Sequence, residues 1–484
     1  MAGIGFELKR LFNHSGIIMQ MRAQLYAAAV ITGPMILGAT LLFIIKYTAQ
    51  YYQMSGTDQD AVVVMTTWSI LFPLLLTSLF TFVLARFIAD MVYEEKLYTI
   101  LPSMYFTISF SLLIGGLGWG VFLYFNDIKL IYKILTYILF MEATVAWIQI
   151  SYTNATKDYR AVLMGFVYAI TTVILVNIIL FNITKTDPIA NLLLSAVLGY
   201  FVMILSYTIV LHRYFPVGKG TAFLSWLWYI KYPSLIQVGF YSTIGLFAHI
   251  MMMWASPWGV NAIGHFYHAP QHDIPALFAF FTTLVATVNF VTSMEVKFYK
   301  HYKTFYSLLN DKGSLFDIQK AYKELVTVMK QELFYLAQIQ IFVTMIAIVV
   351  LGELIGKLGL GFTSGMIGLF RVLTIGYGLY AVGNVFMLLQ LYLVNFRGAL
   401  ITSLTLALVN VVGTYYILQL PEIYYGFGFV LAGFAMYIVG WIQLASYSRK
   451  LDYQVYSKQP IFVRENKGFF TKFIEYRDKI AHKR

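Results

Sequence analysis

The sequence contains no cysteine among its 484 residues, and only 12% of them carry a charge. The absence of cysteine excludes disulfide bonds, thiolate metal sites and covalent haem attachment. The low charge, together with 60% hydrophobic residues, excludes a soluble domain and leaves little room for an enzyme module outside a membrane. Residues 1–23 are polar or amphipathic, so we expect no cleavable signal peptide.

Motifs of common catalytic sites are also missing from the sequence. It contains no G-x-x-x-x-G-K-[ST], H-E-x-x-H or G-x-S-x-G sequence, and these mark nucleotide, zinc and serine-nucleophile sites. The glycines at 359, 361 and 365 follow no strand and therefore do not form a dinucleotide-binding turn. We predict that the chain is not an enzyme and needs no cofactor.

Long hydrophobic blocks dominate what is present. Each of the twelve blocks approaches or exceeds the roughly 20 apolar residues that cross a bilayer core of about 30 Å as a helix. They lie at about 24–47, 61–85, 103–125, 131–153, 161–183, 191–211, 234–256, 275–296, 333–356, 366–396, 398–419 and 424–447. The sequence therefore predicts an all-α, multi-pass membrane protein with twelve transmembrane helices.

Lysine and arginine are concentrated on alternate connections between these blocks. With the N-terminus inside, the inner segments hold 28 of the 34 Lys and Arg residues. This bias predicts that both termini are cytoplasmic and that the protein lies in the cytoplasmic membrane. The net charge of +12 is better explained by this topology and by contact with anionic lipids than by nucleic-acid binding.

The longest connection before the midpoint separates six blocks from six. We predict an N-terminal amphipathic segment at 1–23, a six-helix lobe at 24–216, a second six-helix lobe at 217–447 and a basic cytoplasmic tail at 448–484. The second lobe includes a cytoplasmic loop at 297–332. Duplication of a helical half is common in transporters and favours this division.

Two basic cytoplasmic segments have an apolar helical face. In the loop, Ser314 and Asp317 resemble a helix capping box, and basic residues alternate with apolar ones after them. Such helices lie in the headgroup region or bind a cytosolic partner, and the sequence leaves both open. The candidate docking residues are Lys320, Lys323 and Lys330 in the loop and Phe469, Phe473 and Arg477 in the tail.

Ionisable residues inside the blocks are the strongest indication of a functional site, because each is costly unless it faces water or a partner. Arg371 lies about two turns into the tenth block, and Glu142 lies near the middle of the fourth. We predict a substrate path from these two and from Asn384, Tyr377, Tyr380 and Asn289. The alternative is that they are structural hydrogen-bonding groups between helices.

Proline and histidine suggest two further features. Gly33, Pro34 and Pro73 interrupt the first two blocks and are candidate hinge residues, although static kinks have the same signature. His265, His268 and His272, followed by Asp273, have spacings that would allow a weak metal site. Pro270 between them disfavours the helical geometry that such a site needs, so a histidine-containing surface loop is the favoured interpretation.

The N-terminal run Met1–Arg10, MAGIGFELKR, resembles the opening of the PelG family, the membrane transporter of the Pel exopolysaccharide system. The Gly33-Pro34 pair also resembles that family. The resemblance implies the polysaccharide-transporter branch of the multidrug/oligosaccharidyl-lipid/polysaccharide (MOP) flippase superfamily, with a V-shaped pair of six-helix lobes around a central cavity. It also implies an N-acetylgalactosamine-rich substrate, a cytosolic glycosyltransferase partner and membrane components of a synthase complex.

These observations predict transport of a nascent, Pel-like exopolysaccharide across the cytoplasmic membrane, coupled to its synthesis on the inner face. One alternative is a flippase or antiporter of the same fold for lipid-linked oligosaccharides or small molecules, with Glu142 as a proton or cation site. Another is a non-transporting membrane scaffold for a polysaccharide synthase. An integral-membrane acyl- or glycosyltransferase is a further alternative, although no catalytic constellation faces the predicted cytoplasmic side.

Overall fold

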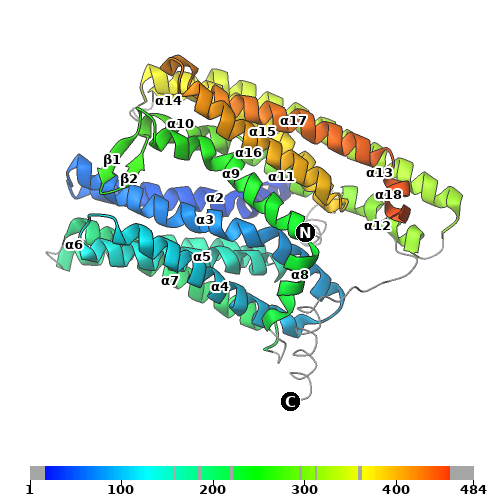
Figure 1. Ribbon diagram of the computed structural model, residues 1–484, viewed down its shortest axis with the longest axis horizontal. Helices are drawn as coiled ribbons and strands as arrows, with labels where there is room; N and C mark the ends of the chain where they lie inside the picture. The colour runs from blue at the N-terminus through cyan, green and yellow to red at the C-terminus, as the bar shows by residue number, and fades with distance from the viewer. Residues whose placement is uncertain are drawn as a thin grey trace. The chain divides into compact units, whose positions relative to one another are not determined.

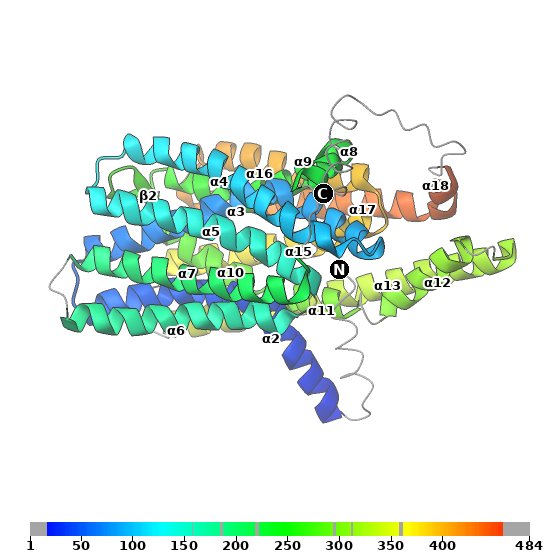
Figure 2. The ribbon, with the colours of Figure 1, turned by 90° about the horizontal axis from the view of Figure 1, so that it is seen from below.

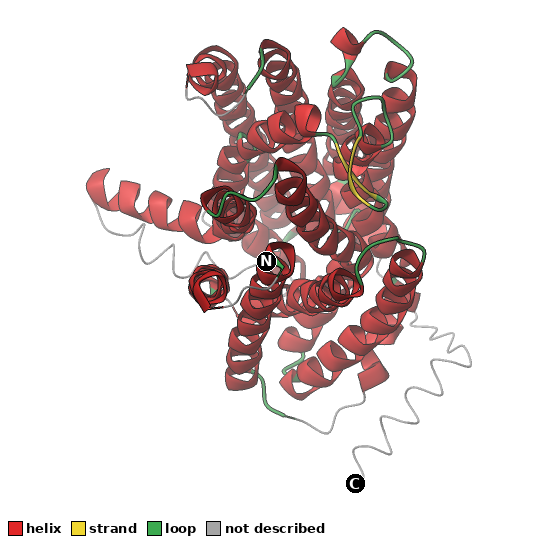
Figure 3. Cartoon of the chain, turned by 90° about the vertical axis from the view of Figure 1, so that its left-hand side faces the viewer, coloured by secondary structure: helices red, strands yellow, loops and turns green. Residues whose placement is uncertain are grey.

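Helices make up almost all of the regular structure (Figure 3). The computed structural model describes residues 17–156, 158–183, 187–217, 222–293, 297–310, 313–357 and 362–457. Within these ranges, eleven helical segments are long and apolar enough to cross a membrane. The first predicted block forms part of α2 (Ile17–Tyr51), of which the shorter stretch Ile36–Tyr51 is apolar. The chain is therefore a mostly helical, multi-pass membrane protein.

The helices follow the order of the predicted hydrophobic blocks (Figure 1). After α2 come α3 (Gly56–Tyr93), α4 (Ile100–Tyr124), α5 (Leu130–Thr156), α6 (Tyr159–Ile183), α7 (Pro188–Tyr214), the short α8 (Trp226–Lys231) and α9 (Pro233–Trp254). A two-stranded hairpin follows, β1 (Val260–Ile263) and β2 (Phe266–His268). The remaining helices are α10 (Pro270–Phe281), α11 (Leu284–Ser293), α12 (Tyr299–Asn310), α13 (Leu315–Ile346), α14 (Gly352–Lys357), α15 (Ser364–Tyr392), α16 (Phe396–Ile417), α17 (Phe427–Ser448) and α18 (Leu451–Ser457).

The predicted block at 275–296 is not one helix but two. Thr282 and Thr283 separate α10 from α11, and each hydroxyl donates to a backbone carbonyl three residues earlier, at 2.7 Å. Threonine side chains compete in this way for the carbonyls that a continuous helix would use. The predicted loop at 297–332 contains α12 and the first half of α13. The helix predicted from Ser314 onwards runs on without interruption into the ninth block.

The described chain forms two compact units. One unit, here the α3–α7 unit, comprises Gly33–Thr243 and the hairpin segment Gly259–His268. The other, here the α10–α18 unit, comprises residues 17–32 of α2, Ile244–Trp258 and the helices from α10 to α18. The helix α9 therefore contributes its first half to one unit and its second half to the other. The hairpin belongs to a different unit from the residues on either side of it.

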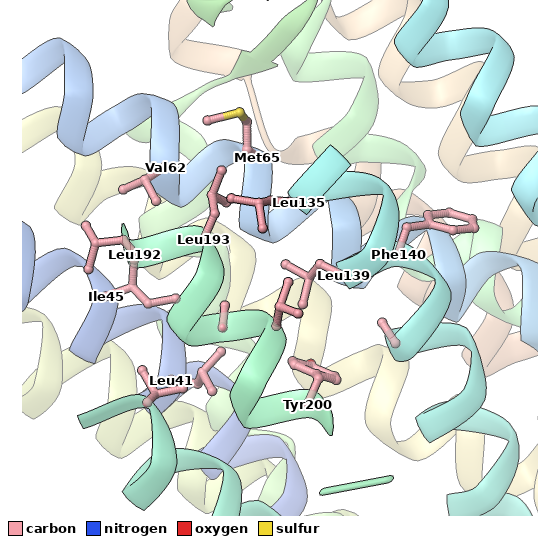
Figure 4. Close-up of a cluster of buried hydrophobic side chains, with 14 of the residues drawn as sticks. Leu41, Ile45, Val62, Met65, Leu135, Leu139, Phe140, Leu192, Leu193 and Tyr200 are labelled. Carbon is pink, nitrogen blue, oxygen red and sulfur yellow. The ribbon is translucent and has the colours of Figure 1, made fainter. Parts of the chain in front are cut away.

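The core of the α3–α7 unit is built from apolar residues that recur at helical spacing on α2, α3, α5 and α7 (Figure 4). Leu135 and Leu139, four residues apart on α5, face this core, while Leu130 and Ile134 of the same helix are exposed. Because a spacing of three or four residues defines one helical face, the opposite face is left for lipid. The side chains that meet in Figure 4 are Leu41, Ile45, Val62, Met65, Leu135, Leu139, Phe140, Leu192, Leu193 and Tyr200.

In the α10–α18 unit, α15 and α17 approach each other closely because glycine lies at the contact. A Cβ atom at Gly433 would lie 2.6 Å from the Gly376 carbonyl oxygen, which is shorter than any real contact of that kind. Small residues at such crossings let helix backbones pack closely in membranes. Phe370, Leu373 and Phe429 form the neighbouring apolar core.

The start of α7 carries a charged cap. Asp187 accepts from the Ile189 N–H at 3.1 Å and forms an ion pair with Lys129 Nζ at 2.6 Å, and the Tyr132 hydroxyl also donates to it. Partial burial alone would raise the pKa of Asp187, but these donors and the Lys129 charge outweigh it and lower the pKa below 3.8.

A carboxylate whose pKa is lowered by folding stabilises the protein above its unfolded pKa and loses that effect as the pH falls through the folded pKa. We expect Asp187→Asn to lower stability by about 0.5–1 kcal/mol at neutral pH, because the pair is partly solvent-screened while the amide keeps the cap. The difference from wild type should disappear as the pH falls below about 4. Thermal unfolding of the purified protein across pH measures it, and a difference that persists at low pH would contradict the assignment.

The β-hairpin is fixed to the α3–α7 unit by its turn and by one aromatic side chain. The turn residue Gly264 has φ +54°, and the neighbouring His265 N–H donates to Asn126 Oδ1 at 3.1 Å. The Tyr267 carbonyl accepts from the Trp68 indole N–H at 2.9 Å. Phe266 is fully buried among aromatic rings of α3 and α4, with centroids 5.4 Å from Trp68 and 5.3 Å from Phe122.

Candidate functional site

Buried polar side chains inside the α10–α18 unit form a hydrogen-bonded network. Asn410 of α16 donates to the Gly245 carbonyl at 2.8 Å and to His249 Nδ1 at 3.4 Å, and it accepts from the Thr414 hydroxyl at 3.0 Å. Since the Gly245 carbonyl can only accept, the Asn410 amide nitrogen must face it. His249 Nδ1 is then an acceptor, so the neutral ring carries its proton on Nε2, 3.3 Å from the Tyr377 hydroxyl.

A second pair of polar groups lies beside this network at the start of α10. The His272 ring is fully buried, 5.3 Å from the His249 ring, and its Nδ1 lies 3.5 Å from Asp273 Oδ1. The other carboxylate oxygen of Asp273 accepts from the Trp254 indole at 2.9 Å and from the Ala269 N–H at 3.0 Å. Within the described residues neither nitrogen of His272 has a hydrogen-bond partner.

Glu142 occupies the middle of α5 in the α3–α7 unit. It is half-buried, and its Oε2 is buried without a hydrogen-bond partner among the described residues. Asn177 of α6 is also fully buried, and neither of its side-chain polar atoms is hydrogen-bonded within the described part of the chain. Unsatisfied polar groups of this kind are rare in a settled core and indicate a place for water, a proton or a ligand.

Arg371 of α15 is held by the helix that precedes it in sequence. Its guanidinium lies 3.4 Å from Glu353 Oε1 of α14 and packs over Gly352, where a Cβ atom would come within 3.0 Å of Arg371 Nε. A π-helical turn, Ala347–Leu351, directly precedes α14, and such turns are frequent at functional sites. The Arg371 side chain stays 41% exposed, so several of its five N–H donors are left for another ligand.

The other predicted path residues are distributed between the two helices α11 and α15. Tyr377 is buried and bound to His249, whereas Tyr380 and Asn384 are half-buried on the same helix. Asn289 donates to the Val285 carbonyl of its own helix at 3.0 Å. Arg371 and these four residues belong to the α10–α18 unit, and Glu142 belongs to the other unit.

The candidate hinge residues lie inside continuous helices. Gly33 is buried in α2, where a Cβ atom would come within 2.4 Å of the Leu163 side chain, and the helix continues through Pro34. Pro73 is buried inside α3 and leaves that helix unbroken. Proline removes one helical hydrogen bond at each position. Whether either position acts as a hinge stays a prediction.

The three histidines considered as metal ligands do not all belong to one unit. His265 and His268 belong to the hairpin of the α3–α7 unit, and His272 is buried in α10 of the other unit. Across the described ranges, no group of three His, Cys, Asp or Glu residues is arranged to hold a metal ion.

The candidate docking residues of the loop lie on α13. Ser314 caps this helix and accepts from the Asp317 N–H at 3.2 Å, which confirms the predicted helix start. Lys320, Lys323 and Lys330 are exposed on its outer face, while Ile318 and Leu325 are buried. The tail candidates Phe469, Phe473 and Arg477, together with most of the segment at 1–23, lie outside the described residues.

The sequence analysis identified Arg371, Tyr377 and Asp273, but it did not identify the residues that contact them. It did not identify Trp254 as the donor to Asp273, or Gly352 as the residue that makes room for Arg371. For the hydrogen bond between Trp254 and Asp273, the sequence contained one indication: a tryptophan near the end of one hydrophobic block and an acidic residue just before the next. Without the turn between them, that proximity could not be deduced.

Comparisons with known proteins agree with this architecture. The family model PelG, described as "Putative exopolysaccharide Exporter (EPS-E)", matches residues 1–456. A search of curated proteins found no match. An inward-facing multidrug resistance MATE family transporter of the MOP superfamily aligns at a TM-score of 0.55 and 11% identity, covering 93% of this chain and 98% of its own.

Two further solved structures align comparably. An outward-facing MATE transporter of the MOP superfamily gives a TM-score of 0.54 and 11% identity, covering 88% of this chain and 96% of its own. The Vibrio cholerae MATE transporter VcmN in the bent form gives 0.53 and 13%, covering 89% and 98%. At such identity the likeness establishes the fold, and the match to the family model establishes the family. The chain belongs to the PelG family of exopolysaccharide exporters.

Proposed function

We propose that this protein carries a nascent exopolysaccharide, rich in N-acetylgalactosamine, across the cytoplasmic membrane while a cytosolic glycosyltransferase extends the polymer. The observation that carries the proposal is the family match over residues 1–456 on a transporter fold. The lysine and arginine bias supports the orientation, with both termini in the cytoplasm.

The polymer's length constrains the mechanism. A growing polysaccharide cannot be enclosed whole in one transport cycle. The protein must therefore provide a path that stays occupied by the polymer while synthesis continues. Addition of sugars at the cytoplasmic end then supplies part of the driving force. Arg371 contributes free N–H donors to such a path, and tyrosines such as Tyr380 offer flat rings with a polar tip that suit sugar faces.

The experiment removes this protein from cells that keep the rest of the synthase and locates newly made polymer with a lectin specific for N-acetylgalactosamine. We expect surface polymer to fall to background and polymer to accumulate in the cytoplasm. Normal surface polymer would contradict the proposal. Loss of polymer in every fraction would instead favour a scaffold that the synthase needs for activity.

A flippase for lipid-linked oligosaccharides is the second candidate. The buried Oε2 of Glu142, which has no hydrogen-bond partner among the described residues, favours it, because a gradient-driven carrier needs buried groups that exchange a cation or proton. Cells from which this protein has been removed distinguish a flippase from a polymer exporter. Removal of a flippase leaves lipid-linked oligosaccharide, and not free polymer, on the inner side of the membrane.

A further inference from the structure

The helices α12 and α13 form a packed extension of the α10–α18 unit. Phe305 of α12 and Ile318 of α13 are buried in one apolar core. The Tyr322 hydroxyl donates to the carbonyls of Ser448 and Arg449, at 2.9 and 3.1 Å, and so ties α13 to the end of α17. In Figure 2 the extension reaches, together with α18, beyond the ends of the unit's other helices. These contacts make the extension a fixed part of the unit.

The length of α13 places the start of this helix outside the membrane. Exposed large apolar side chains suited to lipid begin at Phe334 and continue through α14, while Lys330 and Glu332 are the last charged residues before them. From Tyr322 to Phe334 a helix rises about 18 Å, and from Leu315 about 28 Å. The headgroup layer is only about 5–8 Å thick, and a tilt of about 20° shortens the rise by less than a tenth. The first two turns of α13 therefore lie roughly 10–20 Å beyond the headgroups.

A groove opens between these first two turns and α18. Its volume is about 310 Å³, and six residues line it: Leu315, Ile318, Gln319, Tyr322, Asp452 and Tyr453. The volume lies at the lower end of the range for small-molecule sites, roughly 300–1,000 Å³. Six lining residues are also far fewer than the roughly 20–30 that each partner contributes to a stable protein interface. The groove therefore has the size of a site for a small ligand or for one unit of a polymer.

The lining groups combine hydrogen-bonding side chains with flat rings. The charge among them is the Asp452 carboxylate. It accepts from the Tyr453 N–H at 2.8 Å, which orients it and uses one of its roughly four acceptor positions. Gln319 is exposed and offers an amide that both donates and accepts. The Tyr322 ring is held in place because its hydroxyl is bonded to two backbone carbonyls, and the Tyr453 ring is 65% exposed.

These groups fit a neutral sugar. An ionised carboxylate only accepts hydrogen bonds, so Asp452 suits a ligand with several hydroxyl donors and repels an anionic one. Tyrosine rings offer flat apolar faces that suit the C–H face of a pyranose. The Gln319 amide matches an acetamido group, which likewise donates and accepts, and the apolar side chains of Leu315 and Ile318 suit the methyl of that group. An N-acetylated hexosamine has all of these features.

We propose that the groove between α13 and α18 binds one sugar residue of an N-acetylhexosamine chain, with Tyr453 stacked on the sugar ring and Asp452 accepting from its hydroxyls. Resting on the proposed function, this chain is the nascent polymer before it enters the membrane. The groove then holds the polymer close to the transporter while synthesis continues, and it selects against polymers of uronic acids.

The test uses the full-length protein, purified in detergent, and an N-acetylgalactosamine tetrasaccharide that carries a photoreactive diazirine. Peptides labelled on irradiation are identified by mass spectrometry, so the groove is distinguished from any other sugar site on the chain. We expect saturable labelling of the peptides that contain Leu315–Tyr322 and Leu451–Tyr453. Tetrasaccharide without the diazirine should compete for this labelling, whereas a tetramer of galacturonic acid should not.

Two substitutions address the two contacts. Asp452→Ala and Tyr453→Ala are each expected to lower labelling of the groove about fivefold or more, because the first removes the acceptor and the second removes the stacking ring. Tyr453→Phe keeps the ring and should stay within about twofold of wild type. The control is Glu324→Ala, which removes an exposed carboxylate of α13 that does not line the groove. Labelling should change less than about twofold in this control.

The inference is overturned if the groove peptides of the wild-type protein are not labelled, or if labelling survives both alanine substitutions. It is equally overturned if the galacturonic acid tetramer competes as well as the N-acetylgalactosamine tetrasaccharide. None of these results decides the proposed function, because transport is tested separately by where the polymer accumulates when the whole chain is removed.

Discussion

Phe266→Ala should destabilise the α3–α7 unit by about 3–5 kcal/mol, the usual cost of truncating a buried phenylalanine. The ring is fully buried, and its neighbours Trp68, Trp119 and Phe122 come from two helices that are distant in sequence from the hairpin. Its removal leaves a cavity lined by rigid rings, which collapse poorly around a missing side chain. Edge-to-face contacts between the rings are lost as well.

Thermal unfolding of the purified protein measures the effect, and we expect a lowering of the melting temperature of roughly 10 °C. The control is Tyr267→Ala in the same strand. Its side chain is exposed, whereas its backbone carbonyl, which accepts from Trp68, is retained. That substitution should cost less than about 1 kcal/mol. Equal effects at the two positions would show that the hairpin is not anchored through Phe266.

Arg371→Ala is expected to reduce export of the polymer about tenfold or more. A charge inside a transmembrane helix is retained only when it faces water, a ligand or a partner. Its ion-pair partner among the described residues, Glu353, is itself exposed and lies at 3.4 Å, so this pair contributes little to stability. Arg371→Lys should restore export only in part, because lysine keeps the charge but loses the planar fork of donors.

Glu353→Gln distinguishes whether Arg371 binds the polymer or serves only as the partner of Glu353 in a structural ion pair. If the arginine binds the polymer, removing the Glu353 charge leaves export within about threefold of wild type, since an exposed pair of this kind contributes little. Surface polymer, measured with the lectin and normalised to the amount of transporter in the membrane, is the readout. A parallel loss in Arg371→Ala and Glu353→Gln would mean that the ion pair is structural and that the path lies elsewhere.

The helical architecture could be predicted from the sequence because hydrophobic length and charge placement are local properties. Each predicted block falls on helix, and Ser314 caps α13 as its spacing with Asp317 indicates. The break at Thr282 and Thr283 was missed because it depends on side-chain hydrogen bonds to the backbone, which do not change the apolar composition. The first half of α13 was predicted as an amphipathic helix, but not as continuous with a transmembrane helix.

The sequence contained a weak indication of the β-hairpin, which the prediction did not use. Gly264 and His265 form a two-residue connection between Val260–Ile263 and Phe266–His268, and glycine at the first central position is typical of such turns. No local pattern, however, could show that this segment belongs to a different unit from its neighbours. The same holds for Arg371, which was identified as an intramembrane charge, because its pairing with Glu353 depends on the intervening turn.

The most direct measurement of the central claim follows polymer into sealed membrane vesicles. Inverted vesicles that carry this protein and its synthase are supplied on the outside with nucleotide-activated N-acetylgalactosamine, and a glycoside hydrolase is then added. The account predicts that newly made polymer is protected inside the vesicles, and that in vesicles lacking this protein any polymer made is digested. Polymer that is digested equally in both preparations would contradict a transport function.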